Sequence, residues 1–178
     1  ILDGNLSLYL NILEDENLAI DLNATDTEGD TLSWTIQSGP LHGFAAIDSG
    51  SGLLAYSPQD DYFGDDNLTV AVSDGNLSDS ILLNITVAAV NDSPVIHSSD
   101  SLGIAENQTK MLEMNATDPE GDSLSWTVQT GPLHGTATID SGTGLMTYSS
   151  QADYFGDDNL TVAVSDGNLS DSILLNIT

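Results

Sequence analysis

Positive charge is almost missing from this chain of 178 residues. It contains one basic residue, Lys110, against 28 acidic residues, and its formal net charge is −27. A surface of this sign repels nucleic acid, anionic membranes and acidic substrates, so none of them is an expected partner. The carboxylates also repel one another within a compact domain. We therefore expect divalent cations, high external salt or both to offset that repulsion.

Cysteine is absent, so no disulfide holds the fold and the redox compartment cannot be read from the sequence. Long apolar runs are absent too. None approaches the roughly 18 residues that a membrane-spanning helix needs, which predicts a soluble segment without membrane contact. An initiator methionine and a signal peptide are also missing, which indicates a processed or excerpted piece of a longer protein.

What the chain does contain is a tandem repeat. Residues 14–86 recur at 106–178 without a gap and with about three quarters of the positions identical, ending in the shared run LTVAVSDGNLSDSILLNIT. A period of about 90 residues suits one small domain that buries a core without disulfides. We predict repeat 1 at 1–89, a linker at 90–94 that Pro94 stiffens, and repeat 2 at 95–178. Tandem modules of this kind are typical of arrays built for reach, display or adhesion.

Apolar and polar residues alternate with a period of two through each repeat, so that one face of each run is apolar. In repeat 1 the alternating runs are residues 18–24, 32–36, 68–72 and 81–87. Turn residues separate these runs, and no segment has helical spacing. The pattern predicts six or seven short strands per repeat in an antiparallel β-sandwich, with Trp34 and Trp126 in the cores.

An ordered set of motifs carries a family resemblance. The motifs are NATDPEGDSLSW at 115–126, GPLHGTATID at 131–140, YSSQADYFGDDNL at 148–160, VSDGN at 164–168 and the joint VNDSP at 90–94. The set resembles the bacterial Ig-like and cadherin-like tandem repeats of large surface proteins and adhesins; only residues 1–12 match poorly. The resemblance implies an all-β fold, with two tandem Ig-like/cadherin-like antiparallel β-sandwich domains of about seven strands each. It also implies an extracellular or cell-surface location.

Acidic clusters offer the six to eight oxygen ligands that calcium takes. Two turns place carboxylates at alternate positions, where they can converge on one ion. Because neighbouring strands are antiparallel, these turns and the turn after the sixth strand can lie at the end of the sandwich that holds the linker. The candidate ligands are Asp26, Glu28, Asp30 and Asp74 in repeat 1, Asn91 and Asp92 in the linker, and Asp118, Glu120, Asp122 and Asp166 in repeat 2. The alternative is that these acids solvate a halophilic or marine surface and cap turns.

The cadherin resemblance implies calcium between consecutive domains. The ligands that it implies here are Glu14 and Asp61 of repeat 1, Asn91 and Asp92 of the linker, and Asp118, Glu120 and Asp166 of repeat 2. The linker departs from the cadherin pattern at Ala89 and Ser93, so we expect fewer or weaker ions than in a full cadherin joint. A bound ion would cancel repulsion and hold the domains in line as a stiff rod.

Asparagine is found mostly in the glycosylation motif Asn-Xxx-Ser/Thr. Strand alternation places a strand Asn and the hydroxyl two residues later together on the solvent face. We predict N-glycosylation at Asn5, Asn23, Asn67, Asn76, Asn84, Asn107, Asn115, Asn159, Asn168 and Asn176. Asn91 also has the motif but is the weakest site, because Asp92 and Pro94 follow it closely. The alternative is that Asn and Thr simply fill polar outward positions.

No motif in the sequence predicts catalysis. His42 and His134 occupy the same GPLHG turn in the two repeats without a nucleophile motif nearby, and we interpret them as turn-packing residues. Paired acids such as Asp65 and Asp66 are interpreted as solvated pairs on turns, without the burial that raises the pKa of a catalytic acid. We therefore expect no enzyme activity.

Three functions are left open. The first is a structural or adhesive module, assembled with further copies of the repeat or neighbouring subunits in an array or filament, stiffened by calcium and coated with glycan. The second is a carbohydrate-binding accessory module of a secreted enzyme. Its candidate aromatics, Tyr62/Phe63 and Tyr154/Phe155, are expected to pack at a sandwich corner instead. The third is a passive spacer. Residues 1–12 alternate like a strand, and either form an ordinary first strand or pair with a neighbouring subunit's sheet edge.

Overall fold

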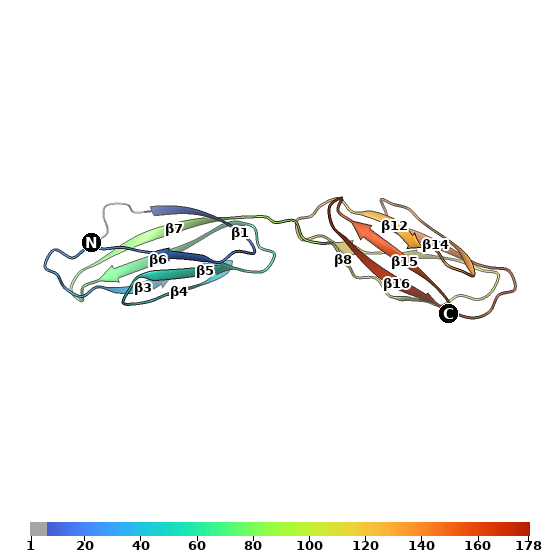
Figure 1. Cartoon of the computed structure of the whole chain (residues 1–178), viewed down its shortest axis with the longest axis horizontal. Coiled ribbons are helices and arrows are strands. Elements are labelled where there is room, and N and C mark those ends of the chain that lie inside the picture. Colours follow the sequence, from blue (N-terminus) through green and yellow to red (C-terminus); the bar gives the residue numbers. More distant parts are fainter. Residues whose placement is uncertain (1–6) are drawn as a thin grey trace. The chain divides into compact units, whose positions relative to one another are not determined.

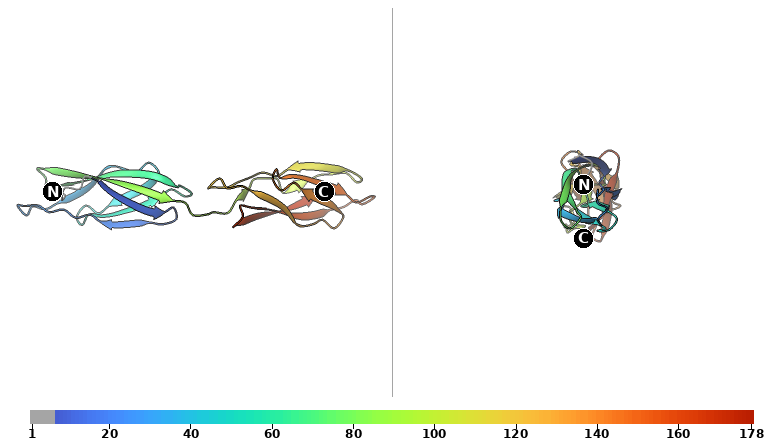
Figure 2. Two further views of the ribbon diagram at one scale, coloured as in Figure 1. Left: turned by 90° about the horizontal axis from the view of Figure 1, so that it is seen from above. Right: turned by 90° about the vertical axis from the view of Figure 1, so that its left-hand side faces the viewer.

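The computed structural model of the chain describes residues 7–178, which divide into two compact units between Val90 and Asn91. Within the described range both units are built from strands and turns alone (Figure 1, and from above in Figure 2). No helix long and apolar enough to cross a bilayer is found among these residues. The all-β prediction is confirmed.

Unit 1 is a sandwich of two sheets. Its strands are β1 (Ser7–Leu13), β2 (Leu18–Asp21), β3 (Ser33–Ser38), β4 (Gly43–Ile47), β5 (Leu53–Pro58), β6 (Gly64–Ser73) and β7 (Ser78–Ala88). One sheet has the order β1-β7-β6-β3 and the other the order β2-β5-β4. The predicted number of about seven strands is therefore correct for this unit.

Unit 2 repeats this plan, and its first strand is divided into two short segments. Its strands are β8 (Val95–Ile96), β9 (Ser101–Leu102), β10 (Thr109–Glu113), β11 (Ala116–Thr117), β12 (Ser125–Thr130), β13 (Gly135–Ile139), β14 (Leu145–Ser150), β15 (Asp158–Ser165) and β16 (Ser170–Ile177). The sheets have the orders β12-β15-β16-β9, β10-β14-β13 and β11-β8. The chain between residues 95 and 102 thus pairs first with β11 and then with β16, and the described part of the first strand of unit 1, β1, pairs with β7.

One strand pair in each unit is parallel, a feature that the antiparallel prediction lacks. β1 runs parallel to β7 from Ser7↔Leu82 to Leu13↔Ala88, and β9 runs parallel to β16. The other pairs in the described part of the chain are antiparallel. Short turns specify antiparallel neighbours. No turn joins β1 to β7, so the sequence carries no local signal for their relative direction.

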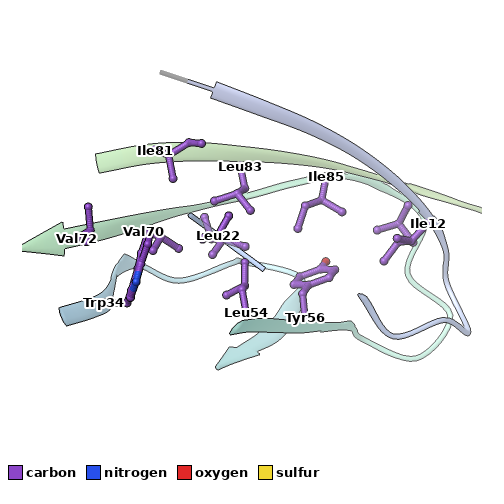
Figure 3. Close-up of a cluster of buried hydrophobic side chains, with 12 residues drawn as sticks. Ile12, Leu22, Trp34, Leu54, Tyr56, Val70, Val72, Ile81, Leu83 and Ile85 are labelled. Carbon is purple, nitrogen blue, oxygen red and sulfur yellow. The ribbon is translucent and has the colours of Figure 1, made fainter. Parts of the chain in front are cut away.

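The alternating apolar residues fill the space between the sheets, as predicted. Trp34 and Trp126 are buried, with 4% and 5% of their surface exposed. Leu54 and Tyr56 on β5 face Leu83 and Ile85 on β7 across the core (Figure 3). Burying one such side chain contributes roughly 1.5–3 kcal/mol, so the two cores supply the main stabilisation of the units.

One glycine is required for this packing. Gly52 has a φ of +78°, and a Cβ atom there would lie 2.6 Å from the Leu22 carbonyl oxygen and 2.9 Å from the Trp34 ring. Only glycine tolerates both the left-handed backbone and such a close approach. The turn before β5 can therefore close directly over the tryptophan.

Candidate metal centre

Glu14 is one of the buried acids of unit 1. It directly follows β1 and has 4% of its surface exposed. Its main-chain N–H donates to the Ala88 carbonyl, and its carboxylate Oε1 accepts the Val90 N–H at 2.5 Å. The second oxygen, Oε2, is buried without a hydrogen-bond partner. A buried carboxylate oxygen without a donor is unfavourable unless a cation is supplied.

Two acids of unit 2 share the turn between β11 and β12. The Asp118 carboxylate Oδ1 accepts the Asp122 N–H at 2.9 Å, and the Glu120 carboxylate Oε2 accepts the Asp92 N–H at 3.0 Å. Their second oxygens, Asp118 Oδ2 and Glu120 Oε1, are buried without hydrogen-bond partners. The turn therefore directs unsatisfied carboxylate oxygens toward the start of unit 2.

The first residues of unit 2 connect this turn to a second one. Carboxylate oxygens of Asp92 and Glu120 lie within 4.8 Å of each other. The Asn91 side chain donates to Asp166 at 2.8 Å and accepts from Asn168 at 3.3 Å. Both turns thus lie at the end of the sandwich where the chain enters unit 2, as predicted.

Hydrogen bonds also keep Asp166 ionised. The Asn168 N–H and then the Asn91 side chain donate to its carboxylate and hold its pKa below the usual value. No pattern in the sequence predicts the hydrogen bond from Asn168 to Asn91, because the fold must first bring residues 77 positions apart into contact. The other contacts at this end follow from the acidic turns predicted above.

The single basic residue does not neutralise this cluster. Lys110 is the only Lys or Arg in the sequence, and its ammonium group donates to the Gly103 carbonyl at 2.7 Å. The carboxylates therefore have no lysine or arginine partner. The oxygens Glu14 Oε2, Asp118 Oδ2 and Glu120 Oε1, which have neither a hydrogen-bond donor nor a lysine or arginine beside them, are hard ligands of the kind that calcium prefers.

The other predicted ligands satisfy their own turns. Asp26 accepts the N–H groups of Glu28 and Asp30 at 3.0 and 2.9 Å. Asp74 accepts those of Leu77 and Asn76, which together lower its pKa. Glu28, Asp30, Asp61 and Asp122 are exposed, and Asp61 has a left-handed φ of 56°. In residues 7–178 none of these carboxylates joins a cluster of three, so their role as ligands stays a prediction.

One pair of acids was misread from the sequence. Asp66 is not solvated: it has 3% of its surface exposed and accepts the N–H groups of Leu41 and His42 and the hydroxyl of Tyr56. Asp158 is its buried counterpart in unit 2. The signal was available, because Asp66 continues the inward face formed by residues 68, 70 and 72.

The histidines pack on aromatic rings, as predicted. His42 stacks on Tyr62 at 4.2 Å, and His134 stacks on Tyr154 at 3.9 Å. The phenylalanines that follow these tyrosines do not pack at the corner: Phe63 is 43% and Phe155 87% exposed. Each tyrosine is turned inward, and its hydroxyl donates a hydrogen bond to a main-chain carbonyl. The phenylalanine that follows it in the chain therefore faces outward.

Most of the predicted glycosylation sites lie at the surface. Asn84 is half-buried and Asn5 lies outside the described residues, while the exposed sites are Asn23, Asn67, Asn76, Asn107, Asn115, Asn159, Asn168 and Asn176. The amide nitrogens of Asn168 and Asn176 already donate hydrogen bonds. Occupancy of the sites stays a prediction.

The fold and its repetition define the class: the protein is built from tandem Ig-like β-sandwich repeats. Residues 5–86 and 91–178 each match the family model of the bacterial Ig domain. The chain belongs to the bacterial Ig domain family.

Similarity to individual proteins is weaker. The chain is 26% identical over 122 residues to chitinase A of Pseudoalteromonas piscicida, a match that covers 66% of this chain and 14% of the chitinase. Among solved structures, human protocadherin-24 EC1-2 has a TM-score of 0.62 at 18% identity, covering 99% of this chain and 95% of that one. Human CDH23 EC21-23 has a TM-score of 0.62 at 18% identity, covering 97% and 67%. These likenesses show the cadherin-like fold.

Proposed function

We propose that this chain is a non-catalytic, extracellular structural or adhesive module whose inter-domain joint is stiffened by calcium. Domains of this class are typically non-catalytic and extracellular. The observation that carries the proposal is the set of buried carboxylate oxygens of Glu14, Asp118 and Glu120, which lack hydrogen-bond partners in a chain with one basic residue.

Covalent connectivity relates the two units whatever their orientation. The Glu14 carboxylate accepts a hydrogen bond from the Val90 N–H, and the Glu120 carboxylate accepts one from the Asp92 N–H. Two residues of extended chain span at most about 7 Å. The carboxylates of the two repeats are therefore attached to neighbouring points of one short segment. Under this proposal, a calcium ion bound by Asp92, Asp118 and Glu120 would also take Glu14 as a ligand.

The ion would act mechanically. Without the ion, the carboxylates would repel one another and the joint would flex. With the ion, its two positive charges would offset that repulsion, and the carboxylates would share it as ligands. A module of this kind suits an array of further copies of the repeat or of neighbouring subunits. N-linked glycans on the exposed asparagines would cover sheet edges and limit lateral aggregation.

The test is a calcium titration of the full chain at constant ionic strength, followed by thermal melting and small-angle scattering. Calcium should raise the melting temperature and lengthen the particle; saturation at one hundred times Kd corresponds to about 2.7 kcal/mol. Glu120→Gln with Asp118→Asn should abolish both responses. The matched control is Glu28→Gln in the corresponding turn of unit 1, which should leave them intact. A melting temperature that follows sodium chloride and ignores calcium would contradict the proposal and leave the acids as surface solvation.

Carbohydrate binding is a second candidate, favoured by one observation. Phe155 is 87% exposed, and an exposed aromatic ring is a platform on which a sugar can stack. The similarity to a chitinase agrees with an accessory role, although the chain spans only 14% of that enzyme. A pull-down on insoluble chitin should retain the wild-type chain and lose Phe155→Ala. Equal retention of both, or of neither, would remove this candidate.

A further inference from the structure

A row of three side chains crosses the outer face of one sheet in unit 1. Strands β1, β7 and β6 are neighbours in this order, and Tyr9 pairs with Asn84, which in turn pairs with Asn67. Paired residues of neighbouring strands point to the same face of a sheet. Their neighbours in the chain, such as Leu68 and Leu83, are buried in the core, so the row faces outward.

Two residues of this row belong to glycosylation motifs, and the third is an aromatic ring at the surface. Asn67 precedes Thr69, and Asn84 precedes Thr86, in the motif Asn-Xxx-Thr. Tyr9 is 76% exposed. We propose that the row holds one N-linked glycan, which is attached to Asn67 and lies across Asn84 with a sugar ring stacked on Tyr9. The inference rests on the glycan coat of the proposed function.

Direct pairing of the two asparagines leaves room for one glycan. The Cβ atoms of residues that face each other across two antiparallel strands are about 4.5–5.5 Å apart. A sugar ring with its substituents is wider than this gap, and two such rings would compete for the same space above the sheet. A glycan on Asn67 therefore excludes a second one on Asn84 in the folded chain.

The surroundings select Asn67 as the attachment site. Its side chain is exposed, whereas Asn84 is half-buried between its two neighbours in the row. The Thr86 hydroxyl, which completes the Asn84 motif, already donates to the Asp65 carboxylate at 2.9 Å. Transfer would join the Asn67 amide nitrogen to the anomeric carbon of an oligosaccharide pyrophosphate donor. The amide loses one proton, and the bond from that carbon to the pyrophosphate breaks, with its electron pair leaving on the phosphate oxygen.

The spacing of the strands brings such a glycan to Tyr9. Neighbouring strands are about 4.8 Å apart, so Asn67 and Tyr9 are separated by about 10 Å across the sheet. The first sugars of a glycan on Asn67 cover this distance. The apolar face of a sugar ring stacks on an exposed aromatic ring, and the Asn84 amide between them offers both donors and an acceptor to the sugar hydroxyls.

Unit 2 carries the same row with the ring replaced. Asn159 pairs with Asn176, and Asn176 pairs with Ser101, the counterpart of Tyr9 in the repeat. The Asn176 amide also donates to the Asp100 carbonyl at 3.2 Å. A glycan on Asn159 would therefore meet a small hydroxyl where unit 1 presents a ring, and the two rows form a comparison within one chain.

The test uses the full chain secreted from a eukaryotic host that adds high-mannose N-glycans. Glycopeptide mass spectrometry should find Asn67 occupied and Asn84 unmodified on the same peptide, and proton NMR should show sugar resonances shifted upfield by the Tyr9 ring. Tyr9→Ser should lose these resonances and keep the occupancy of Asn67. The matched variant Ser101→Tyr should create them for the glycan on Asn159. Both substituted positions are exposed, so both variants should fold.

Two kinds of result would overturn the proposal. Occupancy of both Asn67 and Asn84 on one peptide, or sugar resonances that are the same in wild type and Tyr9→Ser, would remove the glycan row and leave the glycan coat intact. A chain that leaves this host without any N-glycan would remove both. The calcium response of the joint is measured separately, so neither result decides the calcium part of the proposed function.

Discussion

Asp66 and Asp158 show how a chain with one basic residue keeps a buried carboxylate ionised. Burial opposes ionisation of Asp66, but hydrogen bonds from Leu41, Asn67, His42 and Tyr56 outweigh it and hold the pKa below the usual value. Asp158 follows the same pattern. Burial and the neighbouring Asp158 in turn raise the pKa of Tyr148 to about 12. The carboxylate therefore ties the turn at residues 133–134 to β14 and β15.

This anchor predicts an acid-dependent loss of stability. A carboxylate whose pKa is lower in the folded state contributes stability above its unfolded pKa of about 4, and loses it as the pH falls through the folded value. Asp158→Asn should lower the free energy of unfolding by roughly 1–3 kcal/mol at pH 7, because the amide offers one acceptor oxygen where donors bind both oxygens of the carboxylate. The difference from wild type should shrink below about pH 4 in urea unfolding curves.

Tyr148→Phe is the matched control, because it removes one donor and keeps the carboxylate. It should destabilise less than Asp158→Asn and retain most of the acid dependence. A constant difference between Asp158→Asn and wild type from pH 7 to pH 3 would show that the anchor does not depend on charge.

At the scale of elements, β10 holds the only tryptic site of the chain. Lys110 lies in this edge strand, whose pairing to β14 extends from Thr109 to Glu113. A protease needs an extended, accessible segment, so cleavage after Lys110 requires local opening of β10. The native chain should resist trypsin and, once unit 2 opens, give two fragments, 1–110 and 111–178.

The measurement is the rate of fragment formation by mass spectrometry as the temperature rises. A variant with Lys110→Gln and Ser49→Lys moves the site to an exposed turn, and should be cut quickly at temperatures where wild type is intact. Equally fast cutting of both would mean that β10 is open in the native state.

The elements also show what a sequence can reveal. The inward faces of residues 68–72 and 81–87 were predictable, because alternation is local and needs only the period of a strand. The division of the first strand into β8 and β9 was not, because it depends on which sheet edge offers the better partner. For Asn91 and Asp166, the sequence predicted the end of the sandwich at which they meet. The burial of Asp66 was also predictable from this alternation, although its donors Leu41 and His42, distant in sequence, were not.

For the whole molecule, the acidic composition and the buried carboxylates both raise the question of how negative charge is neutralised, the first over the whole surface and the second at single oxygens. The net charge of −27 sets a general repulsion that any salt can screen. Oxygens such as Glu14 Oε2 and Glu120 Oε1 are buried without a hydrogen-bond partner, and under the proposed function a coordinated ion would neutralise them. The composition was enough to predict the general repulsion, whereas the buried oxygens could be identified only from the fold.

The duplication itself creates an ambiguity for folding. The sequence over 68–86, which contains most of the hairpin β6–β7, is identical to that over 160–178 in β15–β16. An unfolded chain therefore has two interchangeable hairpins for one β1. Closing β1 onto the distant copy roughly doubles the loop, which costs only about 0.6 kcal/mol. Synthesis from the N-terminus removes the ambiguity, because the first hairpin emerges and folds before the second exists.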